Sequence, residues 1–341
     1  MKLQKMATAA LAGAGMLVLI LDGQTALSGA AAGMELCLKT VVPSLFPFLF
    51  LCSVLTDSLW GSVFPWMRQI SGKLGIPEGG ESLLIAAVLG GYPAGAQAIG
   101  QAYQEGKLER TCAEHLLSFC SNAGPAFLFG ITAHQFPGMS HIWALWGIQI
   151  LAALITGMMD STGGNSRTAL SSGNHSVSEI LTRSVKTMGV LCGWIVLFQM
   201  LSAFLSRWFF WYLPEEIQVI FTGILELSSG CCILSQIEPL WLRFLVCSGF
   251  LSFGGICVLM QTASVISSLS LKSYLSGKLK QTAISLLLSA LFWMLGWPIL
   301  LSAALLLIPV FRKKEVDFPL HPLYNGCITT GRIKTCCFEK K

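Results

Sequence analysis

Long apolar runs, separated by short polar stretches, extend along almost the whole chain. Three of them, 187–206, 244–271 and 281–311, contain no Asp, Glu, Lys or Arg, and 116–159 is uncharged over a length sufficient for two crossings. A helix that crosses the hydrocarbon core of a bilayer needs about 20 such residues. The pattern therefore predicts an all-α, polytopic integral membrane protein in contact with the lipid bilayer. Helices are expected near residues 6–27, 34–60, 82–104, 112–133, 139–160, 185–208, 216–236, 242–270 and 281–311.

Composition agrees with this class and excludes several others. Of the 341 residues, 54% are hydrophobic and 11% are charged, against about 25% charged residues in a typical soluble domain. The net charge of +5 comes from Lys and Arg in short loops and at the chain ends, as the positive-inside rule predicts, so no nucleic-acid partner is expected. The sequence contains no HExxH, GxSxG, GxGxxG or phosphate-loop motif, and its cysteines form no CxxC pair. We therefore expect no enzyme activity, no cofactor and no bound metal.

One polar stretch divides the chain into two membrane halves. Residues 160–183 are rich in Gly, Ser, Asn and Thr, which is typical of a solvated loop. The first apolar run could be a secretory signal peptide, but the many later spans favour a retained transmembrane helix. The expected organisation is an N-terminal transmembrane helix (1–33), a first membrane repeat (34–160), a polar linker (161–184), a second membrane repeat (185–312) and a disordered tail (313–341).

Short motifs recur in the two halves in the same order. Gly90-Gly91 followed by Gln97 recurs as Gly254-Gly255 followed by Gln261, and the tripeptide GKL starts at both 106 and 277. These matches predict two structurally related halves, with their relative orientation left open. Internal repeats with paired interrupted segments are typical of secondary transporters, whose substrate sites lie at the interruptions.

Four interruptions by Gly, Pro or Ser occur inside the apolar segments. A helix broken within a bilayer leaves backbone N–H and C=O groups that only protein or a water-filled cavity can satisfy. In transporters such groups bind the substrate; kinked helices with small residues for close packing are the alternative explanation. The candidate substrate-binding residues are Gly90, Gly91, Tyr92, Pro93, Gly95 and Gln97 at the first interruption, Ser121, Asn122, Gly124 and Pro125 at the second, Glu226, Ser228 and Ser229 at the third, and Gly254, Gly255 and Gln261 at the fourth.

Asn122 and Glu226 are the most informative polar side chains among these candidates. Pro125 suits the first turn of a new helix, which Ser121 or Asn122 could cap. Asn122 can both donate and accept hydrogen bonds to a substrate, with an interhelical hydrogen bond as the alternative role. Glu226 lies in the apolar stretch FTGILELSSGCCIL, and a carboxylate inside a membrane is costly and indicates function. It could carry a coupling proton, ligate Na⁺ or anchor the Ser-Ser-Gly break, unless it reaches the membrane interface.

The chain resembles the YlbJ-type sporulation integral membrane proteins of the nucleoside-recognition (Gate) domain superfamily. The resemblance covers residues 34–300 and rests on PSLFPFLF (43–50), LGGYPAGAQ (89–97), LLSFCSNAGPAFLFG (116–130), LELSSG (225–230) and the Gly-Gly to Gln stretch at 254–261. It implies interrupted, re-entrant helices similar to the repeats of concentrative nucleoside transporters. It also implies a role in endospore formation, in which dipicolinic acid crosses the outer forespore membrane of a bacterial cell.

The residues and the resemblance together favour a secondary transporter of a small organic anion, with dipicolinate as the substrate. Backbone N–H groups at 91–94 and 121–124 would meet the carboxylates of this anion. The side chain of Tyr92 or Phe127 would stack on its pyridine ring.

Two alternatives stay open. In an ion-coupled nucleoside transporter, Gln97, Asn122, Glu226 and Gln261 would contact the base and the ribose. In a non-transporting membrane scaffold or sensor of spore assembly, the interruptions would serve only packing. The coupling ion, H⁺ or Na⁺, is not determined by the sequence, nor is it determined whether the chain acts alone, as a homo-oligomer or with a second membrane protein.

Overall fold

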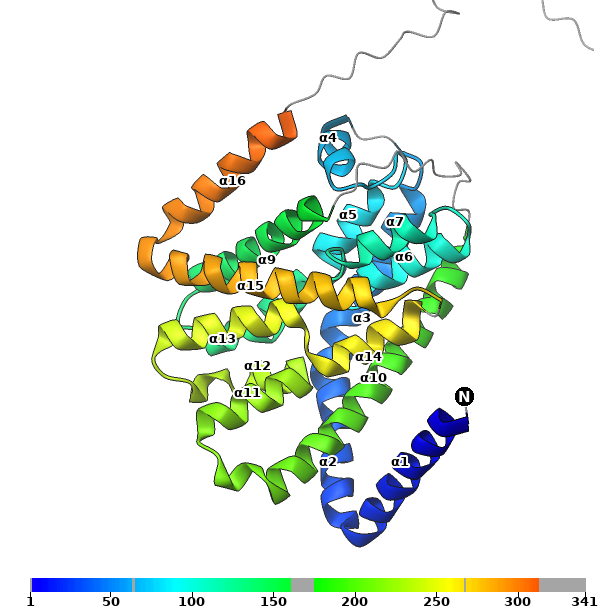
Figure 1. The fold of residues 1–341 in the computed structure, drawn as a ribbon, viewed down its shortest axis with the longest axis vertical. Coiled ribbons are helices and arrows are strands. Elements are labelled where there is room, and N and C mark those ends of the chain that lie inside the picture. Colours follow the sequence, from blue (N-terminus) through cyan, green and yellow to red (C-terminus); the bar gives the residue numbers. More distant parts are fainter. Residues whose placement is uncertain (1, 63–64, 161–174, 267, 313–341) are drawn as a thin grey trace, which may run out of the picture.

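The structure, a computed structural model, describes residues 2–62, 65–160, 175–266 and 268–312. Throughout this part of the chain the regular secondary structure is helical, and no strand occurs in it (Figure 1). The all-α prediction is therefore confirmed. The predicted disordered tail (313–341) and residues 161–174 of the predicted linker lie outside the described residues.

Sixteen α-helices make up most of the described chain. They are α1 (Lys2–Leu21), α2 (Gly23–Leu36), α3 (Val42–Ser58), α4 (Pro65–Lys73), α5 (Ser82–Ile85), α6 (Ala94–Gln104), α7 (Arg110–Leu117), α8 (Pro125–Gly130), α9 (Met139–Met159), α10 (Val177–Trp208), α11 (Glu215–Leu225), α12 (Leu227–Cys232), α13 (Leu240–Phe253), α14 (Gly255–Ile266), α15 (Leu271–Leu295) and α16 (Trp297–Arg312). Two π-helical turns continue helices: η1 (Cys37–Val41) joins α2 to α3, and η2 (Ala86–Gly90) extends α5.

Four helical stretches of the described chain are long and apolar enough to cross a membrane. They are Gly23–Ser58, Met139–Met159, Val177–Trp208 and Leu240–Ile266. The first combines α2, η1 and α3, and the last combines α13 and α14. The chain is thus a polytopic membrane protein, as its hydropathy pattern predicts.

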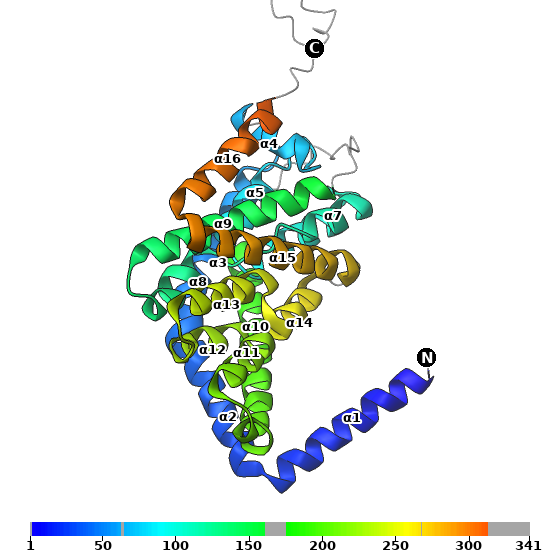
Figure 2. The ribbon, with the colours of Figure 1, turned by 60° about the vertical axis from the view of Figure 1, so that its left-hand side comes forward.

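Two long helical columns and a stack of crossing helices form the body of the molecule. The column of α2 and α3 lies beside α10, and the contact is close because Gly29 and Gly33 face it: a Cβ on either glycine would lie 2.8 Å from a Cα of α10. Helices α9, α13 and α15 pack on one another across the columns (Figure 1). Phe244 and Phe292 stack between α13 and α15, with ring centroids 5.4 Å apart. Helix α1 diverges from this body (Figure 2).

All four predicted interruptions are present, because glycine or a local cap ends each helix. The predicted helix 82–104 divides at Gly91, 112–133 at residues 118–124, 216–236 at Glu226, and 242–270 at Gly254. Each division produces two short helices where the hydropathy pattern shows one long run.

Three boundaries differ from the prediction for local reasons. Helix α10 starts at Val177, eight residues early, because Ser176 and Glu179 form a capping box, so the last part of the predicted linker is helical. Helix α15 starts at Leu271, ten residues before the predicted start at 281, because the Ser270 hydroxyl caps it there. The predicted helix 281–311 is divided at Gly296, which has a φ of 71°. Helix α15 ends at Leu295 and α16 starts at Trp297.

The predicted internal repeat has one matching structural feature. Gly91 and Gly255 both adopt a positive φ, 71° and 80°, directly before α6 and within the first turn of α14. Gln97 and Gln261 are both buried on the helices that follow, and these helices pack against each other. The two GKL motifs differ in context, since the first lies in the turn before α7 and the second lies inside α15. The repeat stays a prediction.

Candidate functional site

The first and second interruptions cross each other with their backbones in direct contact. A Cβ on Gly124 would lie 2.8 Å from the Cα of Gly91, and a Cβ on Gly95 would lie 1.8 Å from the carbonyl oxygen of Cys120. No side chain larger than hydrogen fits at these positions. We call this contact between residues 90–95 and 120–125 the first crossing.

The third and fourth interruptions form a second crossing, of residues 223–230 with residues 254–255. A Cβ on Gly255 would lie 3.1 Å from the carbonyl oxygen of Gly223, and a Cβ on Gly230 would lie 2.2 Å from the Cα of Gly223. The four interruptions that the sequence predicts are therefore brought together in pairs.

Tyr92 connects the two crossings. Its hydroxyl group lies 3.1 Å from the carbonyl oxygen of Leu251 and 3.2 Å from that of Ser252, near the end of α13. These carbonyls belong to the last turn of a helix, where partners within the helix are missing. The ring packs on Gly254, where a Cβ would lie 3.1 Å from the Tyr92 Cζ. The first half of the chain thus supplies a hydrogen bond to the interruption in the second half.

Lys278 of α15 projects into the first crossing and is not among the site residues that the sequence predicts. Its side chain is fully buried, with an exposed fraction of 0%. The Nζ group donates to Gln281 Oε1 at 2.7 Å, Tyr92 OH at 3.1 Å, Asn122 Oδ1 at 3.3 Å and the carbonyl oxygen of Ser121. All four acceptors are neutral, and among the described residues no carboxylate forms an ion pair with Lys278. The crossing therefore holds a buried basic group without a counter-charge.

Asn122 is the centre of this network. Its Oδ1 accepts from Lys278 and, at 2.7 Å, from Gln281 Nε2, while its Nδ2 donates to the carbonyl oxygens of Phe119 at 2.8 Å and Ala87 at 3.4 Å. The predicted helix cap is wrong: Gly124 occupies the N-cap position of α8, because the Asn122 amide is directed back towards the preceding turn. Pro125 is the first residue of α8, as its ring geometry favours.

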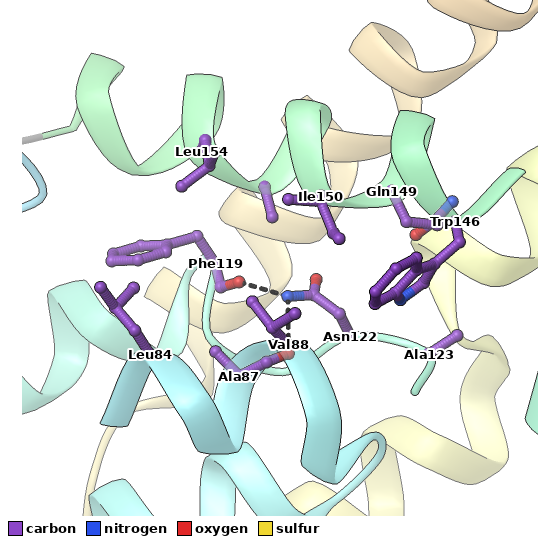
Figure 3. Close-up of a pocket in the computed structure, with 11 residues that line it drawn as sticks. Leu84, Ala87, Val88, Phe119, Asn122, Ala123, Trp146, Gln149, Ile150 and Leu154 are labelled. Carbon is purple, nitrogen blue, oxygen red and sulfur yellow. Dashed lines mark hydrogen bonds between the residues drawn. The ribbon is translucent and has the colours of Figure 1, made fainter. Parts of the chain in front are cut away.

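Two pockets adjoin the first crossing, and Ala123 lines both. Pocket A is narrow, with a cavity volume of about 20 Å³. Its lining is largely apolar, with Phe119, Leu84 and Leu154 towards one end and Trp146 and Gln149 towards the other, and Asn122 between them (Figure 3). Pocket B has a similar cavity volume of about 20 Å³. It is lined by Val41, Leu45, Tyr92, Ala123, Phe127, Leu191, Ile195, Glu226, Leu227, Ser228, Val258 and Gln261.

Glu226 lies in pocket B, where it caps a helix. It is 1% exposed, so the alternative position at the membrane interface is excluded. Its carboxylate accepts from the backbone N–H groups of Ser228 at 3.0 Å and Ser229 at 2.6 Å, and from the Ser229 hydroxyl at 2.5 Å. Gln199 of α10 donates to that hydroxyl at 2.6 Å. Of the roles predicted for Glu226, anchoring the Ser-Ser-Gly break is the one that these contacts show.

No family model and no solved structure matches the chain. The chain is similar to the sporulation integral membrane protein YlbJ of Bacillus subtilis (strain 168), at 25% identity over an alignment of 333 positions that covers 82% of this chain and 79% of that protein. This similarity supports a YlbJ-type assignment. Together with the four long apolar helices, the similarity to an integral membrane protein supports integral membrane localisation.

Not every predicted residue joins the lysine network. Gln97 faces a third, polar pocket beside Asp57 and Lys107, because it lies on the side of α6 away from the crossing. Gln261 lines pocket B and donates to Cys257 Sγ at 3.2 Å. Gly90 lies near Cys52, whose Sγ would be 3.1 Å from an added Cβ, and Pro93 is the N-cap residue of α6.

A second buried polar cluster adjoins pocket A, and the sequence analysis missed it. Gln149 of α9 donates from Nε2 to the Ser252 hydroxyl at 2.8 Å and the Ser285 hydroxyl at 3.3 Å. Ser248 Oγ lies 2.6 Å from Ser285 Oγ and 2.7 Å from Ser289 Oγ. The signal was present as two serine pairs with a spacing of four residues, which places each pair on one helix face. The Gln149 Oε1 lacks a hydrogen-bond partner within the described part of the chain.

Proposed function

We propose that the chain is a secondary transporter of a small organic anion, dipicolinate, across a membrane of a bacterium that forms endospores. The observation that carries this proposal is Lys278, a fully buried amino group with only neutral partners at a crossing of broken helices. Burying a charge without a counter-charge costs several kcal/mol. A substrate carboxylate beside Lys278 would supply the missing charge.

Pocket A offers suitable contacts for the rest of such a substrate, and its walls must move apart to admit it, since the cavity volume is about 20 Å³. The pyridine ring of dipicolinate is flat and apolar, and the pocket offers Phe119 and Trp146 for ring contacts. The Trp146 indole N–H lacks a hydrogen-bond partner among the described residues, so it can donate to a second carboxylate. Asn122 separates the pocket from Lys278, and rotation of this amide would let a carboxylate reach the ammonium group.

The arrangement of the two pockets supports transport rather than simple binding. Pocket A is bounded by η2 and α9, and pocket B is bounded by α3, α10 and α12. They share Ala123, so the extended segment at residues 121–124 lies between them. An anion released from pocket A past this segment would enter a space on the other side of the crossing. The name of the Bacillus relative supports the assignment of this transport to sporulation, and the outer forespore membrane is the proposed location.

Pocket B favours a second candidate substrate, a nucleoside. Its polar lining groups, Glu226, Ser228 and Gln261, are acceptors and donors suited to hydroxyl and amide groups. A carboxylate there would repel a dianion, which is why we place dipicolinate beside Lys278. Ion-coupled nucleoside transport through Glu226 is therefore the alternative to test.

Uptake of dipicolinate into proteoliposomes that contain the purified chain tests the proposal. We expect saturable uptake, unaffected by excess nucleoside and at least about tenfold lower in the Lys278→Gln and Asn122→Leu variants. Lys280→Gln is the matched control, because Lys280 lies on the same helix and pairs with Asp160 at 2.5 Å, away from the crossing. Competition by nucleosides would favour the alternative substrate. Absence of uptake of either compound by folded protein would support the scaffold or sensor hypothesis.

A further inference from the structure

We propose that Lys278 binds the coupling proton: its amine is protonated when the anion is bound and neutral when the site is empty, so that H⁺ and the anion cross together without Na⁺. This inference rests on the proposed anion transport and names its coupling ion. It assigns a second role to the group that recognises the substrate.

A cage of oxygen atoms encloses the Lys278 amine. Four oxygen atoms surround Lys278 Nζ, three from side chains and one from the backbone at Ser121. Such a set of neutral oxygen ligands is what an alkali cation would need. Here the ammonium group, attached to α15 by its own side chain, occupies that place. A separate Na⁺ at the first crossing is therefore unnecessary.

This cage fits both protonation states of the Lys278 amine. An ammonium group donates three hydrogen bonds and has more than enough acceptors in this cage. A neutral amine has two N–H groups, for Gln281 Oε1 and the Ser121 carbonyl, and one lone pair. The Tyr92 hydroxyl lies 3.1 Å from Lys278 Nζ and within donating distance of the carbonyl oxygens of Leu251 and Ser252. Its single hydrogen can turn from these carbonyls to the amine lone pair. Tyr92 is thus a positioning residue that exchanges one hydrogen-bond partner when the amine loses its proton.

Lys278 differs from Lys107 and Glu226, which are also buried, in having no partner that compensates its charge. The buried side chains with a formal charge in the described chain are Glu81, Lys107, Glu226 and Lys278. Lys107 pairs with Glu105 at 2.7 Å, and Glu226 is satisfied by two N–H groups and a hydroxyl. Lys278 has neutral partners only, so its charge is unfavourable until an anion arrives.

The groups that face Lys278 leave few competitors for this proton. Tyr92 faces it from the first interruption, Tyr274 from its own helix, with the ring centroids 5.0 and 5.9 Å from Nζ, and Cys120 lies on the second interruption. From α13 only the Leu251 and Ser252 carbonyls approach, through Tyr92. A phenol and a thiol are mostly neutral in water near pH 7 and burial favours that neutral form, whereas an amine is charged in water and burial disfavours its charge. The amine is therefore the group whose charge changes with substrate binding.

Thermodynamic linkage converts this arrangement into a measurable effect. If anion binding favours the protonated amine, protonation must favour anion binding by the same factor. Where the empty site holds a neutral amine, each bound anion takes up about one proton. The affinity for the anion then falls about tenfold for each further pH unit.

Calorimetric titration of the full-length chain with dipicolinate tests the inference. Binding heats in two buffers of different ionisation enthalpy give the number of protons taken up, from about pH 6 to about pH 9, where both substrate carboxylates are ionised. We expect up to one proton per anion for the wild type and for Lys280→Gln, and equal affinity in sodium and choline salts. Lys278→Arg should bind without proton uptake and with an affinity independent of pH, because guanidinium does not deprotonate.

Each outcome either supports or overturns proton coupling through Lys278. Binding by the wild type without proton uptake and with a constant affinity would overturn proton coupling and leave anion transport standing. Dependence of binding on Na⁺ would overturn it as well. Loss of proton uptake in Glu81→Gln, together with retention in Lys278→Arg, would move the proton to Glu81, whose buried carboxylate oxygens lack partners among the described residues. Absence of dipicolinate binding would remove the proposed substrate and this inference with it.

Discussion

Replacement of Gly95 by alanine tests whether the first crossing holds the substrate site together. The added Cβ would lie 1.8 Å from the Cys120 carbonyl oxygen and 2.9 Å from its carbon. Contacts of a Cβ under 3.0 Å essentially do not occur in proteins. The start of α6 and the segment at Cys120 must therefore separate by at least 1.2 Å, the difference between 1.8 and 3.0 Å.

This separation should lower the stability of the protein and disrupt the hydrogen bonds of Lys278. Overpacking a well-packed interior costs about 1–3 kcal/mol, and we expect the upper end because the obstacle is backbone. Ser121 follows Cys120 directly, so its carbonyl moves away from Lys278 by a similar distance. A hydrogen bond stretched by about 1 Å beyond its normal length is effectively lost.

The assay compares dipicolinate uptake and thermal unfolding of Gly95→Ala with those of Gly189→Ala. Gly189 is an exposed residue of α10, and an added Cβ there meets no described atom within 4 Å. We expect uptake at least about tenfold lower for Gly95→Ala, with a midpoint of unfolding lower by several degrees, and little change for Gly189→Ala. Normal uptake and stability in Gly95→Ala would refute the crossing as described.

Three further substitutions separate the network from its supports. Tyr92→Phe should reduce uptake and lower stability by about 1–3 kcal/mol, since the carbonyls at the end of α13 lose their hydroxyl partner; an unchanged unfolding midpoint would contradict this. Glu226→Ala should cost about 2 kcal/mol or more, because it removes the cap of α12 and leaves two buried N–H groups unpaired, while the dipicolinate concentration that gives half-maximal uptake stays the same. Ser176→Ala should lower stability by about 1 kcal/mol through loss of the capping box on α10, and a loss of uptake there would argue against a purely structural role.

The interruptions were predictable because they depend on local chemistry. Gly91, Gly254 and Pro125 restrict or free the backbone wherever they occur, so their effect is visible in the sequence. That the interruptions meet in pairs could not be read from the chain, since the contacts join glycines such as Gly91 and Gly124 that leave no side-chain signal. The sequence singles out the Asn122 amide as a candidate, and in the structure its hydrogen bonds run towards the lysine rather than towards α8.

Lys278 was missed because lysine at the edge of an apolar run normally indicates the membrane surface. Neighbouring Lys280 fits that expectation, with its ion pair to Asp160. The two lysines lie about 200° apart around α15, at 100° per residue, and only the packing of α15 on the crossing decides which one faces inward. The position of Gln97 away from the lysine network could not be predicted for the same reason, since the face of α6 that meets the crossing is set by tertiary contacts.

The contact of Gly91 with Gly124 limits which parts of the molecule can act as gates. Backbone touches backbone there, so no rotation of a side chain can loosen it, and we expect the crossing to move as one rigid unit. The walls that can yield are made of long apolar side chains, such as Val88 and Ile150 on pocket A and Leu191 and Ile195 on pocket B. Disulfide cross-links between engineered cysteines across either wall should therefore stop uptake, because each cross-link would close one side of the site.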